Sequence, residues 1–85
     1  MSAEMHIAGV VVRATPARID AVRRAVAAFP GAEIHAEDNG KLVVTIEAAS
    51  AGELAERVTE IGRLDGVLSA APVYHHAEDL EETSR

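Results

Sequence analysis

The sequence contains no cysteine and no tryptophan, and its only large aromatic residues are Phe29 and Tyr74. The lack of cysteine excludes disulfide bonds, thiolate metal sites and a cysteine nucleophile. Because aromatic residues are scarce, a core has to be built from alanine, valine, isoleucine and leucine, and hydrophobic residues make up 48% of the chain. At 85 residues, we expect one small domain of modest stability.

Positive charge is scarce as well. The formal net charge is −6 and the isoelectric point is near 5.0. This balance argues against nucleic acid as a partner, because nucleic-acid binding needs a basic surface. It allows a cationic partner.

The chain also lacks a long apolar run. The apolar stretch near the N-terminus stops at Arg13, well short of the roughly 20 residues that a membrane-spanning helix needs. No lysine or arginine precedes it, so the pattern of a secretory signal is missing. We therefore expect a cytoplasmic protein without membrane insertion.

The most informative stretch runs from Phe29 to Ala48 and predicts a β-hairpin. Asn39-Gly40 lies between two extended runs, and a type I′ turn needs positive φ at both central residues. The returning strand alternates, which predicts a buried set, Leu42, Val44, Ile46 and Ala48, and an open set, Val43, Thr45 and Glu47. The outgoing strand is expected to bury Ala32, Ile34 and Ala36 and to expose Glu33, His35 and Glu37.

Strands and helices flank this hairpin on both sides. Residues 6–14 form a nearly continuous apolar run typical of a central strand, with Ala8, Val10 and Val12 toward the core and Ile7, Gly9 and Val11 on the open side with Arg13. Thr15-Pro16 predicts a helix start, and an apolar stripe from Ile19 to Phe29 follows. Ser50 and Glu53 form a capping box before a second helix, which Asp65-Gly66 ends.

The last strand is expected over residues 67–75. Pro72 interrupts it, and proline belongs on an edge strand or at a bulge because it cannot donate to the ladder. Its alternation separates two apolar sets, one of which contains Tyr74. We expect a loose N-terminus over residues 1–5, one domain over residues 6–76 and an acidic, disordered tail over residues 77–85.

The order strand, helix, strand, strand, helix, strand predicts an α+β fold. Right-handed crossovers place both helices on the same side of a four-stranded antiparallel sheet, which is the ferredoxin-like βαββαβ plait. Two helices cover one face of the sheet only, so the other face is expected to carry the function. Carboxylates beside aliphatic side chains suit an amphipathic, positively charged peptide. The candidate peptide-binding residues are Val11, Arg13, Glu33, His35, Val43, Thr45, Glu47 and Tyr74, with Glu37 as a further rim carboxylate.

Catalytic and metal sites find little support in the residues. The serines have no base beside them in the pattern, and glycine-rich phosphate loops are missing. His75 and His76 are adjacent, so on a continuous strand they would point to opposite faces and would not share an ion. We expect no enzyme activity, no cofactor and no metal site.

Four segments together resemble the NapD family. They are Gly9-Val-Val-Val12, Ala28-Phe-Pro-Gly-Ala-Glu33, the strand Gly40 to Ala48, and Asp65 to His76 followed by acidic residues. NapD proteins are cytoplasmic chaperones for the periplasmic nitrate reductase. The resemblance implies a ferredoxin-like fold that binds the twin-arginine signal peptide of the catalytic subunit and restrains export until the molybdenum cofactor is inserted.

On this interpretation Glu33 and Glu47 pair with the peptide arginines, while Val11 and Val43 meet its apolar stretch. The protein is expected to be a monomer or a weak homodimer. Two alternatives stay open: a small regulatory plait that binds a small molecule, and a metal carrier that uses His75.

Overall fold

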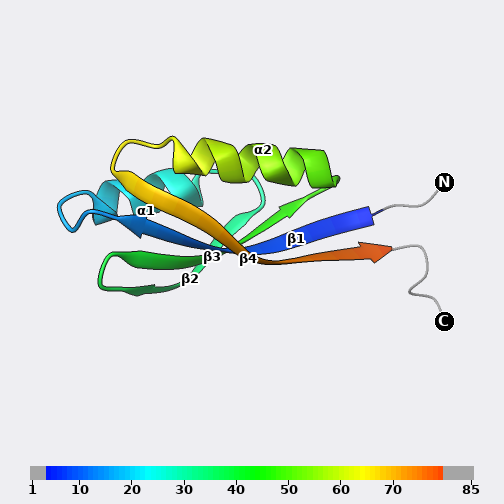
Figure 1. Ribbon diagram of the computed structural model, residues 1–85, viewed down its shortest axis with the longest axis horizontal. Helices are drawn as coiled ribbons and strands as arrows, with labels where there is room; N and C mark the ends of the chain where they lie inside the picture. Colours follow the sequence, from blue (N-terminus) through cyan, green and yellow to red (C-terminus); the bar gives the residue numbers. More distant parts are fainter. Residues whose placement is uncertain (1–3, 80–85) are drawn as a thin grey trace.

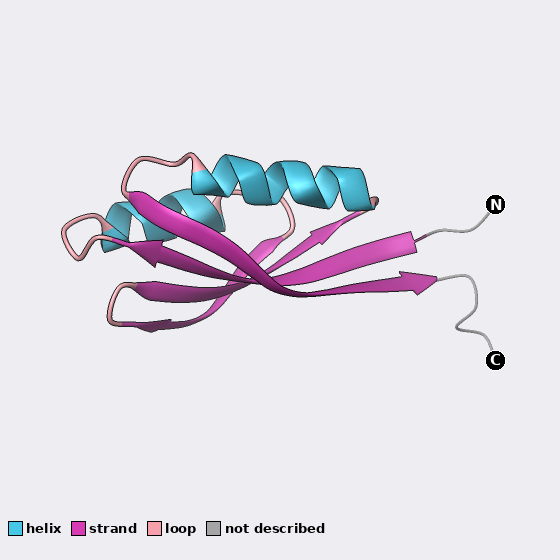
Figure 2. Ribbon diagram, in the orientation of Figure 1, coloured by secondary structure: helices cyan, strands magenta, loops and turns pink. Residues whose placement is uncertain are grey.

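A computed structural model describes residues 4–79 as one sheet covered by two helices on one side (Figures 1 and 2). The elements are β1 (Glu4–Ala14), α1 (Ile19–Ala27), β2 (Ala32–Asp38), β3 (Lys41–Ala48), α2 (Ala51–Gly62) and β4 (Val67–Asp79). The strands lie in the order β2-β3-β1-β4, and every neighbouring pair is antiparallel. The predicted ferredoxin-like βαββαβ plait, with β1 as a central strand, is confirmed. None of the helices in this part of the chain is long and apolar enough to cross a membrane.

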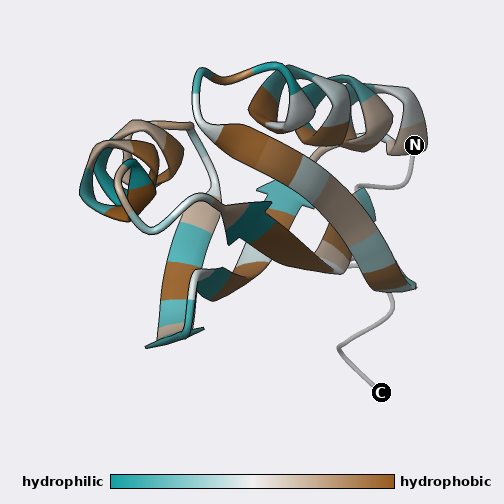
Figure 3. Cartoon of the chain, turned by 60° about the vertical axis from the view of Figure 1, so that its left-hand side comes forward, coloured by the Kyte–Doolittle hydropathy of each residue, from teal (hydrophilic) through white to brown (hydrophobic). Residues whose placement is uncertain are grey.

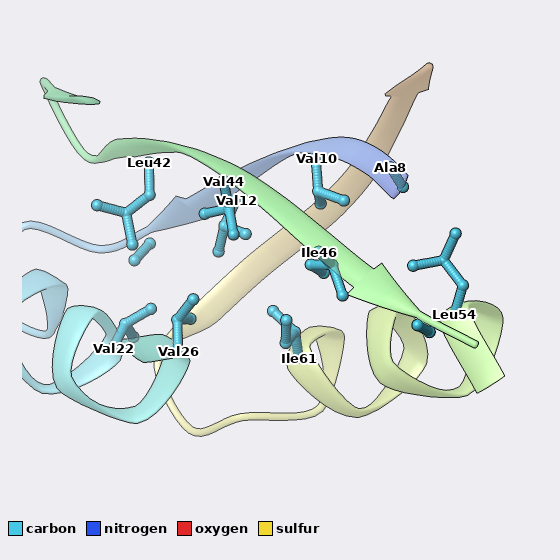
Figure 4. Packing of buried hydrophobic residues seen from close by; sticks show 12 residues of the cluster. Ala8, Val10, Val12, Val22, Val26, Leu42, Val44, Ile46, Leu54 and Ile61 are labelled. Atoms are coloured by element: carbon cyan, nitrogen blue, oxygen red, sulfur yellow. The ribbon is translucent and has the colours of Figure 1, made fainter. Parts of the chain in front are cut away.

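The core lies between the sheet and the helices, and its buried hydrophobic residues are all aliphatic, with Phe29 partly buried against them. Figure 4 shows side chains from α1 and α2 pointing toward those of β1 and β3. The alternation holds throughout β3 and from His6 to Ala14 of β1, where every second residue is buried and Gly9 is buried in addition. The buried hydrophobic residues are Ala8, Val10, Val12, Ala14, Val22, Val26, Leu42, Val44, Ile46, Ala48, Leu54 and Ile61.

The predicted hairpin turn and the second helix cap are present. Asn39 and Gly40 have φ values of 50° and 80°, as a two-residue type I′ turn requires. The Ser50 hydroxyl accepts a hydrogen bond from the Glu53 amide at 3.1 Å. The Glu53 carboxylate accepts from the amide of Ala49 at 3.5 Å, one residue before the cap. Both halves of the capping box are therefore recognisable, and the second one is displaced by one residue.

The first helix starts later than the sequence predicts. Thr15 does not cap it; instead, the carbonyl of Thr15 accepts a hydrogen bond from the Arg18 amide at 2.9 Å, and residues 16–18 form a turn. Pro16 fits this turn as well as it fits a first helical position, because both need φ near −65°. The helix proper begins at Ile19, and Arg18 occupies its N-cap without a side-chain hydrogen bond.

The first and last strands extend beyond the predicted domain limits. β1 begins at Glu4 and β4 continues to Asp79, and these two residues are partners in the ladder. The predicted loose end at residues 4–5 and the predicted tail at residues 77–79 are therefore wrong; residues 80–85 lie outside the described part. Each strand supplies the backbone hydrogen bonds that the other needs, so polar residues continue the ladder. In Figure 1 this β1–β4 ribbon runs out past α2.

Bulges change the alternation in both edge strands. On β2, Ile34 pairs with Val44 but Ala36 pairs with Val43, so His35 is the extra residue and the faces exchange after it. On β4 the ladder skips Leu68 and Val73, and both of these side chains are exposed. The sequence-based alternation for β4 is therefore wrong in part, whereas the prediction that Pro72 lies on an edge strand is confirmed.

Candidate functional site

The sheet face opposite the helices is the candidate site, and we call it the open face. Residues that are directly opposite on neighbouring strands point to the same side of a sheet, so the pairing of the strands defines its members. Figure 3 shows the strands banded in hydrophobic and hydrophilic residues. From β4 across to β2 the open face contains Ser69, Ala71, Tyr74 and His76, then Met5, Ile7, Gly9, Val11 and Arg13, then Lys41, Val43, Thr45 and Glu47, then Glu33, His35, Ala36 and Asp38.

The middle of the open face is apolar. Val11 is paired with Val43 on one side and with Ala71 on the other, and Ala36 continues the row onto β2. The Val43 side chain is 45% exposed although its neighbour Val44 is fully buried. A row of aliphatic side chains in contact with solvent offers area that a partner can bury at about 25 cal/mol per Å².

Tyr74 lies beside this row and rests on Gly9. The two residues are partners in the ladder, and a Cβ atom placed on Gly9 would come within 2.2 Å of the tyrosine ring. The glycine is therefore needed for close approach of the ring, which accounts for the glycine that the sequence places in the middle of a valine-rich strand. The ring shields Gly9 from solvent, yet Tyr74 itself remains 52% exposed.

One end of the open face is acidic. Glu33 pairs with Thr45, and Glu47 follows Thr45 by two residues, so the two carboxylates are diagonal neighbours with a separation of roughly 7–8 Å between their backbones. The His35 ring is hydrogen-bonded to the Thr45 hydroxyl at 2.7 Å and lies 3.9 Å from the Glu33 carboxylate. The Glu47 carboxylate makes no salt bridge with any residue between 4 and 79.

The backbone at this acidic end is fastened from the helix side. Arg57 of α2 donates hydrogen bonds to the carbonyl of Glu47 at 3.0 Å and to the carbonyl of Pro30 at 2.8 Å. Its guanidinium also contacts Glu53. Because the guanidinium holds the end of β3 and the turn before β2 together, the strand positions that carry Glu33 and Glu47 are fixed relative to each other.

The other end of the open face carries Arg13 and Lys41 beside Asp38, and the sequence analysis predicted only the first of these. Arg13 and Lys41 are directly opposite each other on β1 and β3. Neither forms an ion pair within residues 4–79, although Asp38 is the partner of Lys41 across the hairpin. Like charges in opposite positions destabilise a sheet. The sequence analysis did not assign Lys41 to the open face, because this residue directly follows the turn. Lys41 lies two residues before Val43 on β3, and the period of two places both side chains on the same face.

The eight predicted site residues all belong to the open face, but Glu37 does not. After the bulge at His35, Glu37 pairs with the buried Leu42, and its carboxylate accepts a hydrogen bond from Arg23 of α1 at 2.7 Å. The prediction that Glu37 lines the open face is therefore wrong, because one extra residue in β2 exchanges the two faces. Val11, Val43 and Tyr74 gather at the apolar centre, and the polar predicted residues separate to the two ends.

The helix side of the sheet has two features that the sequence analysis did not anticipate. An open-sided apolar pocket of about 330 Å³ lies between α2 and the edge strand β4. At its rim His75 is hydrogen-bonded to His6 rather than to its neighbour in sequence. Residues 4–79 contain no group of three or more histidine, aspartate or glutamate side chains arranged to hold a metal ion.

Comparisons with a family model and with known proteins all identify the same family. The family model described as "NapD protein" matches residues 5–79. The chain is 35% identical over 78 residues to "Chaperone NapD" of Paracoccus pantotrophus, covering 92% of this chain and 70% of the relative. It is 31% identical over 84 residues to "Chaperone NapD" of Escherichia coli K12, covering 96% and 97%.

A solved structure shares the fold. It is the solution structure of the E. coli Tat proofreading chaperone protein NapD, with a TM-score of 0.78 and 31% sequence identity. The match covers 89% of this chain and 82% of that one.

Proposed function

The chain belongs to the NapD family of chaperones, and we propose that it binds the twin-arginine signal peptide of the catalytic subunit of a periplasmic nitrate reductase on its open face. In this proposal the protein acts in the cytoplasm, has no catalytic role and carries no cofactor. Its binding restrains export of the subunit until the molybdenum cofactor has been inserted and the subunit has folded.

The observation that carries the proposal is the charge pattern of the open face around its apolar centre. A twin-arginine signal peptide has a basic start followed by an apolar stretch, and the open face has carboxylates next to exposed aliphatic side chains. Glu47 has no ion-pair partner within residues 4–79, so it is available to a cationic ligand. The match in charge and polarity gives specificity as well as attraction at a distance.

The residues divide into two roles. Glu33 and Glu47 accept hydrogen bonds from the two guanidinium groups, which bind carboxylates best in a bidentate geometry. Val11, Val43 and the ring of Tyr74 contact the apolar stretch. Because Glu33 and Glu47 are diagonal neighbours, each can receive one of two adjacent arginines. His35 and Thr45 line the floor between them.

Restraint of export follows from occupancy of the signal. A signal peptide whose arginines and apolar stretch are held on the open face is sterically withheld from any other receptor. Release then requires only that the complex dissociate, since no covalent step is involved. Affinity is expected to fall as salt is added, because ion pairs at an exposed rim are screened over about 8 Å at physiological ionic strength.

Methyl-resolved NMR tests the proposal directly. A synthetic twin-arginine signal peptide of a periplasmic nitrate reductase is titrated into protein labelled at valine methyl groups. We expect shifts at Val11 and Val43 and much smaller shifts at the buried neighbours Val12 and Val44. A peptide with both arginines replaced by glutamine serves as the control and should bind more weakly. Shifts confined to the helix side, or no binding at all, would overturn the proposal.

A second candidate function rests on the pocket between α2 and β4. Apolar residues, including Leu54, Val58 and Pro72, line it together with Thr59 and His75, and its volume of about 330 Å³ suits a small ligand. A regulatory small molecule bound there would shift the methyl groups of Val58 and leave Val11 and Val43 unchanged. The same valine-labelled sample, titrated with the signal peptide and with small metabolites in parallel, separates the two candidates.

A further inference from the structure

Two histidines far apart in the sequence meet on the helix side of the β1–β4 ribbon. His6 is paired with Ala77 and His75 with Ala8, so the two rings are diagonal neighbours on the same face. Nδ1 of His6 lies 2.9 Å from Nε2 of His75, and the ring centroids are 5.2 Å apart with the planes inclined by 41°. Sequence reasoning considered His75 with His76, whereas the structure pairs His75 with His6.

Glu4 determines which nitrogen of His6 carries the proton. Oε1 of Glu4 lies 3.0 Å from Nε2 of His6, and a carboxylate only accepts hydrogen bonds, so Nε2 is the protonated nitrogen. The lone pair of Nδ1 then faces His75, which donates from its Nε2. A carboxylate that holds the far side of an imidazole is the usual support of a metal-binding histidine, because it fixes the tautomer and the ring orientation.

The chemistry of the two ligands indicates the kind of ion. The 2.9 Å between Nδ1 of His6 and Nε2 of His75 is the length of the hydrogen bond that joins the rings, so it places both nitrogens within reach of one ion without fixing the coordination angle. Imidazole nitrogens suit Zn²⁺, Cu²⁺ and Ni²⁺, and the affinity of a given nitrogen site for divalent ions rises along the first transition row to Cu²⁺ and falls at Zn²⁺.

We propose that Nδ1 of His6 and Nε2 of His75 form a binding site for a divalent cation of the copper and nickel class, with Glu4 as its supporting carboxylate. The cation replaces the hydrogen bond between the rings, and the proton on Nε2 of His75 moves to Nδ1 of the same ring. His6 is only 9% exposed and therefore held in place, while His75 is exposed to solvent. Water or a small ligand completes the coordination from the side of the apolar pocket that His75 borders.

Copper titration of the full chain tests this site. The sample is a His35→Gln/His76→Gln variant, which retains only His6 and His75 of the four histidines. We expect saturable binding of one Cu²⁺ and an electron paramagnetic resonance spectrum with nitrogen superhyperfine structure from two imidazoles. A further His75→Gln change should abolish saturable binding, and Glu4→Gln should weaken it by about tenfold.

The matched comparison is between His75 and His76, which are adjacent on β4 but point to opposite faces. His76→Gln should leave the copper affinity of the otherwise natural chain unchanged. Copper binding that survives His75→Gln, or that depends on His76, would overturn the proposal. The buried His6 is tested second, after circular dichroism has shown that His6→Gln folds. Zn²⁺ should bind more weakly than Cu²⁺, and equal or tighter binding would contradict the assigned class of ion.

Discussion

The two faces of this sheet are formed by alternate residues of the same strands, yet they differ in burial and in the pairing of their charges. On the helix side, β1 and β3 place Val10, Val12, Val44 and Ile46, all with no exposed surface, beneath α1 and α2. On the open face the alternate residues of the same strands leave Val43 nearly half exposed. The difference arises because two helices are too few to cover two faces, and it identifies where a partner can gain area that folding has left unused.

The charges differ between the faces as well. Around the helices most arginines have acidic partners: Arg18 with Asp65, Arg57 with Glu53, and Arg23 with Glu37 and Asp20. Hydrogen bonds from Arg23 to Glu37 and then to Asp20 raise the pKa of the Arg23 guanidinium above its usual value. On the open face Arg13, Lys41 and Glu47 have no ion pair with residues 4–79. The paired charges around the helices link elements of the fold to one another. The unpaired charges on the open face, positive at one end and negative at the other, can instead orient a charged partner.

The largest expected effect comes from comparing two adjacent valines on β3, one buried under the helices and one on the open face. Val44→Ala removes two buried methyl groups and leaves a small void, so we expect a loss of about 2 kcal/mol in the free energy of unfolding. Val43→Ala should change stability by less than about 0.5 kcal/mol and should weaken signal-peptide binding instead. Chemical denaturation and peptide titration of both variants measure the two effects. Equal losses of stability would mean that the faces are not energetically distinct.

The second largest effect concerns the affinity for the signal peptide. It is measured by reversing the charge of two carboxylates on the open face and, separately, of two carboxylates on α2. Glu33→Lys/Glu47→Lys should weaken binding of the signal peptide by about tenfold, since two ion pairs worth about 0.7 kcal/mol each are lost. Glu56→Lys/Glu60→Lys makes the same change of net charge on the exposed side of α2. Calorimetry at low and physiological salt should show a large effect only for the first variant. A comparable loss in both would indicate that net charge, rather than the open face, attracts the peptide.

A smaller effect is expected from the cap of α2. Ser50→Ala removes the hydroxyl that accepts from the Glu53 amide, and the expected cost is about 1 kcal/mol of unfolding free energy. Peptide affinity should not change, because the cap lies on the helix side. Thermal denaturation and peptide titration check the two statements. Ser50→Asp provides the control, since aspartate caps equally well and should restore stability.

The fold was predictable because the signals that define it are local. Asn39-Gly40, the capping box and the alternation of β3 each depend on residues close in the sequence, and tertiary packing agrees with them. The late start of α1 was not predictable, because Thr15-Pro16 suits a turn and a helix N-terminus equally well. Pairing extends β1 to Glu4 and β4 to Asp79, and the composition of either segment alone does not reveal that.

The candidate site was predictable to the extent that alternation was unbroken. Val11, Val43, Thr45 and Glu47 lie where period two places them. Glu37 lies on the other face because β2 has a bulge. A bulge depends on how two strands fit each other, and no residue type in β2 indicates its position. The pairing of His6 with His75, which are 69 residues apart, likewise depends on the register of β1 and β4. Residues whose position follows from register are thus the ones for which a structure adds most.

The smallest expected effect concerns Arg13 and gives the direction of the bound peptide. Lys41 and Glu47 are six residues apart on β3, so the cationic and acidic ends of the open face are separated by about 20 Å. This exceeds twice the screening length of about 8 Å at physiological salt, so a peptide whose arginines lie at Glu33 and Glu47 hardly senses Arg13. We therefore expect Arg13→Gln to change affinity by less than about twofold at that ionic strength. If the peptide lay the other way round, its arginines would face Arg13 and Lys41, and removal of one repulsive charge would tighten binding severalfold. Calorimetric titration of Arg13→Gln beside Glu47→Gln distinguishes the two directions. If the arginines lie at the acidic end, Glu47→Gln weakens binding and Arg13→Gln leaves it nearly unchanged, whereas the reverse direction makes Arg13→Gln tighten binding and Glu47→Gln nearly neutral.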